Sequence, residues 1–404
     1  MVDFATASPL DYEALNLGTA PMHIVFLCNE YPPDPHGGIG SFTQTMARAL
    51  TARGHKVTVV GFYSRQQELH EKDDAVAVIR LPHTRIPGSG LITNAKRLAR
   101  ELDRIHGESP IDIIEGPENS LALVPKSSPA AKIIRMHGGH HFFFTTLGKK
   151  PRLLRSWIEK WSFRNADYLC GVSKFVAETT RDLLDLGNRP IEVLPNAVNV
   201  SQFRPLPHVE EERGLIVFVG TVCEKKGILQ LVQAMAQIVG AVPEAHLCVV
   251  GRDSIDPKTG GSFTEHLRQL MPPELKSCVE FRGPVEHALV PELLAKAEVL
   301  VYPSHMEAIG IALIEGLAMG KGMVIGHAGP APEVVENGVS GLLCDPYSPV
   351  SIADSVIMLL KDHQLRSRMG ARARQRAGEL FSLDTIVKRN EAFYRRCLGR
   401  NGHE

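Results

Sequence analysis

The sequence predicts an α/β protein built from two doubly wound, Rossmann-like domains. Three observations predict this fold. Short apolar runs alternate with helical patterns, both halves open on a buried strand, a glycine-bearing loop and a helix, and a stretch without periodicity separates the halves. With 404 residues the chain is long enough to give each domain its own core. Ligands of such folds bind at the carboxyl ends of strands, so we expect a site in a central cleft that both domains face.

The first domain is predicted over residues 1–205. Residues 1–20 carry acids and no basic start of a signal peptide, and are expected to form an extension outside the fold. MHIVFLC (22–28) predicts a buried strand, EYPPDPHGGIG (30–40) a turn-rich loop, and SFTQTMARALTARG (41–54) an amphipathic helix. Further strands are predicted at 55–62, 75–81, 111–116, 131–138, 166–173 and 191–196.

The second domain is predicted over residues 206–404. Prolines and charges cluster without periodicity in SQFRPLPHVEEERG (201–214), which we interpret as the linker. Helices are predicted at 226–239 and from Gly310 onward. The predicted strands lie at 214–220, 245–251, 279–283, 297–304 and 321–327.

The composition excludes several classes of protein. Forty-five basic and 45 acidic residues give a net charge of zero, so no global field indicates nucleic acid. Seven dispersed cysteines without C-x-x-C spacing predict neither a zinc site nor a redox motif, and fit a reducing cytoplasm. No apolar run approaches ~18 residues, so no membrane span is predicted.

Two glutamates in PSHMEAIGIALIEGLAMG (303–320) indicate where the chemistry lies. Glu307 and Glu315 are eight residues apart in an apolar segment, where an ionised carboxylate is costly unless it is paired or hydrogen-bonded. A helix beginning after Gly310 favours an anion at its first turn, and a carboxylate accepts hydrogen bonds from sugar hydroxyls. A nucleotide diphospho-sugar meets both needs. From spacing alone, a helix cap and a structural ion pair explain the two acids equally well.

This segment resembles the E-x7-E signature of retaining glycosyltransferases of family 4, which have the GT-B fold. The resemblance extends over roughly residues 22 to 395 through several ordered motifs. It implies that Glu315 binds the ribose and that Glu307 contacts the transferred sugar. It also implies that the segment 380–404 forms a terminal helix that returns to the first domain.

Other motifs carry the resemblance further. FVGTVCEKKGILQL (218–231) matches the family's diphosphate clamp, although Thr221 stands where an arginine is expected. Lys225 or Arg252 is expected to supply the missing charge. In PHGGIGSF the glycines match a loop that faces the donor phosphates, and His137, after a strand, matches a histidine near the reacting sugar. The residues implied to bind the donor are Gly38, Gly40, Gly220, Thr221, Lys225, Lys226, Arg252, Glu307, Ala308, Ile309, Gly310, Ile311 and Glu315.

Their strand-end position predicts that Glu118 and Asn119 line an acceptor side, the resemblance adds His137 to it, and Ser173, at the start of a helix, is expected to face the same cleft. Among the site residues, His137, Glu307 and Lys226 are assigned to catalysis. The chain contains no D-x-D motif, so neither a metal site nor an obligatory metal cofactor is predicted. Phosphate charge is then met by Lys226, helix amino termini and loop amides.

The resemblance implies a cytoplasmic, retaining, metal-independent hexosyltransferase. Its donor would be a UDP- or GDP-sugar of the UDP-glucose or GDP-mannose type, and its acceptor a sugar, a glycolipid or a small molecule. The reaction would belong to glycan, polysaccharide or glycolipid biosynthesis. Two alternatives stay open: a sugar phosphorylase or sugar-nucleotide epimerase of the same fold, and a non-catalytic nucleotide-sugar binder.

One basic stretch suggests a surface partner. KKPRLLRSWIEKWSFRNA begins at residue 149 and contains both tryptophans of the chain. A basic, tryptophan-bearing helix over 149–164 is able to make a weak peripheral contact with the inner face of a membrane. Because Trp157 and Trp161 are four residues apart, on one helical face, we favour packing of both rings in the core.

Overall fold

The computed structural model describes residues 20–64, 67–84, 90–257 and 259–400. The expected extension at 1–20 therefore lies, except for Ala20, outside the described residues, as do residues 401–404 of the terminal segment. The chain divides into two compact units. The first comprises the described residues up to Val172, Val176–Pro195 and the chain from Asp384; the second comprises Ser173–Phe175 and Asn196–Leu383.

The first unit is built on an eight-stranded sheet in the order β3-β4-β2-β1-β5-β6-β7-β8. Every neighbouring pair is parallel except β3 and β4. The strands are β1 (His23–Leu27), β2 (Lys56–Tyr63), β3 (Leu69–Asp73), β4 (Val76–Pro82), β5 (Ile113–Pro117), β6 (Ala131–Met136), β7 (Tyr168–Gly171) and β8 (Ile191–Val193). The helices are α1 (Gly38–Ala52), α2 (Gly90–Glu108), η3 (Ser120–Leu123), α3 (His140–Thr146), α4 (Leu153–Asn165), α5 (Lys174–Leu184) and α13 (Leu383–Arg400).

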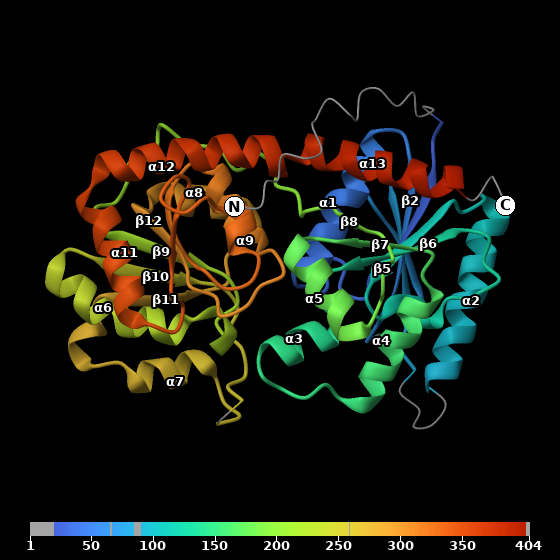
Figure 1. Cartoon of the computed structure of the whole chain (residues 1–404), viewed down its shortest axis with the longest axis horizontal. Helices are drawn as coiled ribbons and strands as arrows, with labels where there is room; N and C mark the ends of the chain where they lie inside the picture. Colours follow the sequence, from blue (N-terminus) through green and yellow to red (C-terminus); the bar gives the residue numbers. More distant parts are fainter. Residues whose placement is uncertain (1–19, 65–66, 85–89, 258, 401–404) are drawn as a thin grey trace. The chain divides into compact units, whose positions relative to one another are not determined.

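The carboxyl-terminal helix α13 lies beside α1 of the first unit (Figure 1). Arg53, at the end of α1, donates to Glu391 at 2.8 Å. Deeper in the unit, the Tyr394 hydroxyl donates to Glu115 on β5 at 2.8 Å, and Asn390 accepts from Arg135. Helix α13 thus supplies polar partners to the centre of a sheet that the preceding residues build.

The second unit contains a six-stranded parallel sheet in the order β11-β10-β9-β12-β13-β14. Its strands are β9 (Leu215–Val219), β10 (His246–Val250), β11 (Val279–Gly283), β12 (Val299–Tyr302), β13 (Gly322–Gly326) and β14 (Leu342–Cys344). The helices are η4 (Glu224–Lys226), α6 (Ile228–Ala241), α7 (Phe263–Leu270), η5 (Pro273–Leu275), η6 (His287–Leu289), α8 (Val290–Lys296), α9 (Ile311–Ala318), α10 (Ala331–Val334), α11 (Pro349–Lys361), α12 (His363–Arg376) and η7 (Ala377–Phe381).

The predicted doubly wound fold is confirmed in both units. Central strands such as β1, β12 and β13 are buried along their whole length, because helices cover both faces of a parallel sheet. In each sheet the strand order reverses beside the first strand, at β1/β5 and at β9/β12. These switch points are where doubly wound sheets hold ligands, at the carboxyl ends of the strands.

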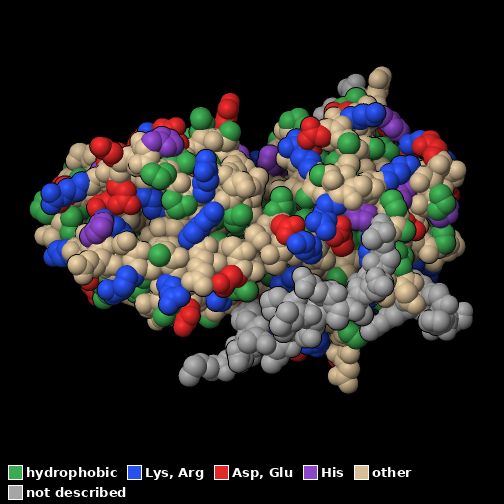
Figure 2. Space-filling model, turned by 90° about the horizontal axis from the view of Figure 1, so that it is seen from above, with side chains coloured by type: hydrophobic (Ala, Val, Ile, Leu, Met, Phe, Trp, Pro, Cys, Tyr) green, Lys and Arg blue, Asp and Glu red, His purple; other side chains and the backbone are tan. Residues whose placement is uncertain are grey.

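The surface carries charges of both signs. Figure 2 shows basic and acidic side chains interspersed over one face, as expected for a chain with zero net charge. All seven cysteines are free thiols. Within the described ranges no helix is long and apolar enough to cross a membrane.

The structure corrects one expectation about α4. Trp157 and Trp161 do not pack in the core, since both side chains are exposed. The buried face of α4 is instead formed by Glu159, Ser162, Phe163 and Asn165. Spacing correctly placed both rings on one face of a helix, but that face is turned outward.

Candidate active site

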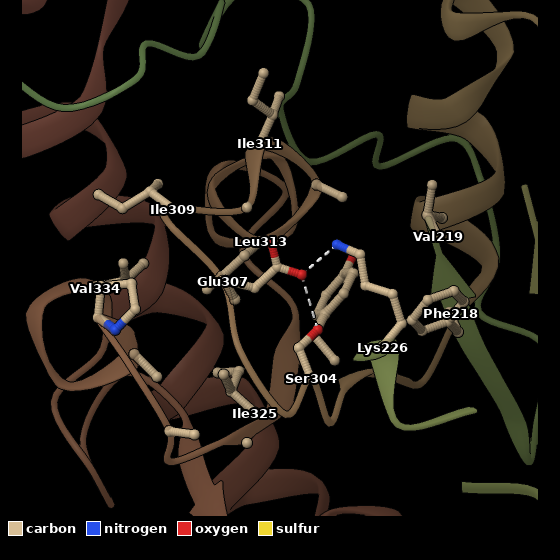
Figure 3. Close-up of a pocket in the computed structure, with 17 residues that line it drawn as sticks. Phe218, Val219, Lys226, Ser304, Glu307, Ile309, Ile311, Leu313, Ile325 and Val334 are labelled. Atoms are coloured by element: carbon tan, nitrogen blue, oxygen red, sulfur yellow. Dashed lines mark hydrogen bonds and ion pairs between the residues drawn. The ribbon is translucent and has the colours of Figure 1, made fainter. Parts of the chain in front are cut away.

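A pocket in the second unit lies at the carboxyl ends of β9, β12 and β13 (Figure 3). Its walls are mostly apolar, with Lys226, Ser304 and Glu307 as polar side chains among them. The strands contribute Phe218, Val219, Tyr302, Ile325 and Gly326, and the loop and first turn of α9 contribute residues 309–313. A mostly apolar pocket with a few convergent polar groups is typical of a small-molecule site.

Lys226 and Glu307 form an ion pair inside this pocket. The Lys226 ammonium donates to Glu307 Oε1, and the Ser304 hydroxyl donates to the same oxygen at 3.0 Å (Figure 3). Burial alone would raise the pKa of Glu307, but Lys226, Lys225 and the Ser304 hydrogen bond bring that pKa below its usual value. Glu307 is therefore ionised at neutral pH.

A glycine brings this lysine to the pocket. Gly227 follows Lys226 with φ at 70°, a left-handed conformation that glycine adopts without strain. A Cβ at Gly227 would lie 1.9 Å from the carbonyl oxygen of Pro303. Only a residue without a side chain allows η4 to approach the end of β12 this closely.

The pocket also receives the amino terminus of α9. Gly310 precedes the helix in an extended conformation, and no side chain caps it. The first turn of a helix carries backbone N–H groups that lack partners within the helix, and its dipole favours negative charge. Together with Lys226, this terminus makes the pocket suitable for an anion.

Glu315 has a different environment from Glu307. It lies on α9, is buried and is not among the residues that line the pocket. Its Oε1 is 2.6 Å from Nε2 of His287 on η6, and this hydrogen bond raises the pKa of His287. Nearby, the buried Tyr302 hydroxyl has no hydrogen-bond partner, and burial together with the Glu315 charge raises its pKa.

Four predicted donor residues lie around η4 and β10. The positive charge of Lys225 contributes to the lowered pKa of Glu307. Thr221 and Arg252 are exposed and do not line the pocket. Gly220 donates its N–H to Val250 at 2.9 Å. Of the two residues expected to replace the missing arginine, Lys225 thus contributes to the lowered pKa of Glu307, whereas Arg252 is exposed outside the pocket lining.

Two side chains hold the loop between Glu307 and Gly310. The Ser173 hydroxyl donates to the Ala308 carbonyl at 3.0 Å, and the Asn196 amide donates to the Ile309 carbonyl at 3.2 Å. Both side chains are buried within the second unit. Ser173, which the sequence placed on the acceptor side, thus positions the backbone that follows Glu307.

In the first unit His137 follows β6 and contacts an aromatic ring. Its imidazole lies edge-on to Phe42 with the ring centroids 5.0 Å apart. Burial and the neighbouring Arg135 charge lower the pKa of His137 to about 3, so its imidazole is neutral. Arg135 is held by Glu115 at 2.7 Å and lies over the same Phe42 ring.

Glu118, which follows β5, is fully buried close to the backbone of His137. Burial raises the pKa of Glu118 to about 8, with a further contribution from the Glu159 charge. One of its carboxyl oxygens has no hydrogen-bond partner. Asn119 beside it is exposed and does not cap η3 with its side chain. At neutral pH Glu118 is therefore a protonated acid beside a neutral histidine.

The glycine-rich loop before α1 already binds a carboxylate. Glu30 Oε1 accepts the N–H groups of Gly37 at 3.0 Å and Gly40 at 2.8 Å. A Cβ at Gly40 would lie 2.0 Å from the Glu30 carbonyl oxygen, so the close approach requires glycine. The sequence analysis assigned Gly38 and Gly40 to the donor phosphates. The sequence did not indicate that the Glu30 carboxylate would accept the N–H of Gly40.

One group of side chains suits a metal ion among the described residues. Glu68, His70 and Glu101 bring three ligand atoms within 4.8 Å of one another in the first unit. Glu101 already pairs with Arg104, however, and none of the three is a predicted site residue. The group therefore adds nothing to the pocket of the second unit.

Comparisons with known proteins place these features in context. Residues 36–202 match the model described as Glycosyltransferase Family 4, and residues 201–376 match Glycosyl transferases group 1. A GDP-mannose-dependent alpha-(1-6)-phosphatidylinositol monomannoside mannosyltransferase of Mycobacterium tuberculosis is 28% identical, over 92% of this chain and 98% of that protein.

Two solved structures share the fold. Sucrose-phosphate synthase from Thermosynechococcus elongatus matches with a TM-score of 0.81 at 21% identity, over 94% of this chain and 100% of that chain. Anabaena HepE in complex with UDP and glucose matches with a TM-score of 0.70 at 18% identity, over 92% of this chain and 99% of that chain. Both comparisons identify the arrangement of elements as GT-B-like.

Proposed function

Because the chain belongs to glycosyltransferase family 4, whose members use nucleotide-sugar donors, we propose that it transfers a hexosyl group from a UDP- or GDP-sugar to an acceptor hydroxyl. The observation that carries the proposal is the pocket in which Lys226, Glu307 and the amino terminus of α9 converge. An ammonium, uncapped helix amides and a carboxylate are the groups that a sugar-linked diphosphate requires.

Lys226 and α9 would stabilise the leaving diphosphate. An ammonium has three N–H donors, so Lys226 can bind a phosphate oxygen while it keeps its bond to Glu307. Glu307 in turn holds the lysine at the helix terminus. Fixed positive groups aimed at the charge that develops on the leaving group are usually the largest contribution to catalysis.

The two glutamates would bind the two sugars of the donor. Ionised Glu307, before α9, is an acceptor for hydroxyls of the transferred hexose, and Glu315, within α9, is the proposed acceptor for the ribose hydroxyls. Tyr302, whose buried hydroxyl has no partner, lines the pocket together with Glu307. His287 would then act as a positioning residue, since it holds one oxygen of Glu315.

The transfer would proceed with retention of configuration and without an obligatory metal. The bond from the anomeric carbon to the diphosphate breaks as the acceptor oxygen bonds to the same face of that carbon. The acceptor proton passes to the departing diphosphate oxygen. Neutral His137 has a ring N–H and a ring lone pair for sugar hydroxyls, and it is proposed to serve with Glu118 and Asn119 on the acceptor side.

The relatives inform the choice of donor and acceptor. One uses GDP-mannose and a phosphatidylinositol mannoside, and another was solved with UDP and glucose. We propose a donor of one of these two types and an acceptor that belongs to a glycan, polysaccharide or glycolipid. A panel of UDP- and GDP-sugars screened for thermal stabilisation would identify the donor, because saturation at 100 times the Kd stabilises by about 2.7 kcal/mol.

The decisive measurement follows release of UDP or GDP with an acceptor, in the presence of EDTA. Release that needs no added phosphate and survives EDTA supports a metal-independent transferase. Dependence on inorganic phosphate would indicate a phosphorylase instead. Binding of every nucleotide sugar without turnover on any acceptor would contradict the proposed reaction.

A further inference from the structure

Helix α4 presents an apolar stripe to solvent. Leu153 and Leu154 are 90% and 69% exposed, and Trp157 and Trp161 are 53% and 41% exposed. At about 100° per residue these four positions fall within one third of the helix circumference. The two indole rings lie 5.4 Å apart and form one continuous surface. We call these four residues the α4 stripe.

The opposite face of α4 is buried and, apart from Phe163, polar, which reverses the usual arrangement of a surface helix. Ser162 accepts the Leu121 N–H at 3.0 Å, and the Asn165 amide donates to the Leu121 carbonyl at 2.8 Å. Glu159 accepts the backbone N–H groups of His140 at 2.8 Å and His141 at 3.0 Å. These bonds fix the orientation of α4, so the exposure of the α4 stripe is built into the fold.

Positive charge surrounds the α4 stripe. Within residues 149–164 the exposed basic residues are Lys149, Lys150, Arg152, Arg155, Lys160 and Arg164. Glu159 is the single acid of this segment, and its side chain is buried and hydrogen-bonded to α3. A segment with six exposed cations and no exposed anion stands out in a chain whose net charge is zero.

We propose that α4 docks the first unit on an anionic lipid bilayer. The α4 stripe would enter the boundary between headgroups and acyl chains, where tryptophan is favoured, while the basic side chains pair with lipid phosphates. Nucleic acid would use the cations but has no place for two exposed leucines. With 13 residues α4 is about 20 Å long, which suits a helix lying in the plane of the membrane rather than one spanning it.

This proposal does not depend on the proposed reaction, because it concerns a surface of the first unit. It goes beyond a weak electrostatic contact, since it names the residues that insert. It also predicts that charge and apolar area both contribute. Removing either alone should therefore weaken binding without abolishing the fold.

The chain carries its own reporter for this test. Trp157 and Trp161 are its only tryptophans, so intrinsic indole fluorescence reports on α4 alone. We expect the emission to shift to shorter wavelength when vesicles containing phosphatidylglycerol are added to the full-length protein, and brominated lipids to quench it. Vesicles of pure phosphatidylcholine should produce a much smaller change, and raising the salt to about 1 M should weaken binding by screening.

Two pairs of substitutions separate the contributions. Leu153→Gln with Leu154→Gln keeps both tryptophan reporters. This double substitution should weaken vesicle binding by about tenfold or more, because it removes apolar area that would otherwise insert into the bilayer. Arg155→Gln with Lys160→Gln should weaken binding by roughly 25-fold, at about fivefold for each charge near an anionic surface.

Matched controls lie on α11 and α12 of the second unit. Met358→Gln replaces a side chain that is 51% exposed, and Lys361→Gln with Arg368→Gln removes two exposed charges. Neither control should change vesicle binding.

Three outcomes would overturn the proposal. The first is a folded protein whose emission is unaffected by phosphatidylglycerol vesicles. The second is a parent protein that is dimeric and does not bind vesicles, together with a Leu153→Gln/Leu154→Gln variant that is monomeric, since the α4 stripe would then be a protein interface. The third is blue-shifted, salt-sensitive binding to nucleic acid without binding to vesicles.

Discussion

Replacing Lys226 by methionine should remove the main positive charge of the pocket with little change in side-chain length. Lys226 contributes in two ways: it pairs with Glu307, and it is the proposed ligand of the donor diphosphate. A hydrogen bond to a charged group contributes about 1.5–3 kcal/mol, so its loss alone should weaken nucleotide binding by roughly 10- to 150-fold. The Glu307 carboxylate that remains would then repel the diphosphate and weaken binding further.

A double-mutant cycle would measure that second effect. Glu307→Gln in the Lys226→Met background removes the stranded negative charge, so we expect it to restore part of the affinity for UDP or GDP. Groups in direct contact typically show coupling energies of about 0.5–3 kcal/mol. Isothermal titration calorimetry of the four proteins with each nucleoside diphosphate gives the coupling directly.

Neighbouring cations provide graded controls. Lys225→Met should cost less than Lys226→Met, because Lys226 lines the pocket and donates to Glu307, whereas Lys225 is not among the lining residues and acts on Glu307 through its charge. Arg252→Met should cost least, because Arg252 is exposed and does not line the pocket. Equal losses in all three variants, or unchanged affinity in Lys226→Met, would refute the assignment of this pocket to the diphosphate.

Three further predictions concern ionisable groups. Because the pKa of His287 is raised, its pair with Glu315 stabilises the protein fully below the ordinary pKa of histidine, and this stabilisation is lost as pH rises through the folded-state pKa. His287→Gln should therefore reduce the change of melting temperature with pH between about pH 6 and 8, and identical curves of melting temperature against pH for variant and parent would contradict this. Because the pKa of Glu118 is raised to about 8, the folded state loses stability as pH rises from the ordinary pKa of a glutamate toward 8. Over that pH range the unfolding free energy of Glu118→Gln, measured by denaturant titration, should increase relative to that of the parent protein. Glu30→Ala leaves the amides of Gly37 and Gly40 without their carboxylate and should cost about 1 kcal/mol of unfolding free energy, whereas Glu30→Gln, which keeps an acceptor oxygen, should cost less.

The periodicity of apolar residues was sufficient to predict both sheets. Buried parallel strands are short, strongly apolar runs, and each predicted run became a strand. Strands β3 and β14 were not predicted. The first, LHEKD, is a polar, antiparallel edge strand without an apolar run. The second, LLC, is apolar but has only three residues, too few to distinguish a strand from a loop.

Sequence spacing could not predict which side chains from distant parts of the chain pair with the site residues. The E-x7-E spacing placed Glu307 before α9 and Glu315 within it, but it did not indicate that a lysine and a histidine respectively would bind these acids. Tyr302, the last residue of β12, and Ser304, two residues after it, share the pocket, although the sequence of this strand is that of ordinary core. Only the packing of η4 on the end of β12 reveals them.

The α4 helix shows why periodicity alone cannot assign a face to the core. Its sequence contains an apolar stripe. Such a stripe is usually buried, because removing apolar surface from water is favourable. Here Glu159, Ser162 and Asn165 lie on the inner face beside Phe163, and each of the three polar side chains is satisfied by hydrogen bonds to backbone groups of α3 or of the segment around η3. Turning the helix over would bury the stripe but leave those backbone groups unpaired, at about 1–3 kcal/mol for each buried group. The fold therefore keeps the polar face inside, and the exposed tryptophans are the consequence.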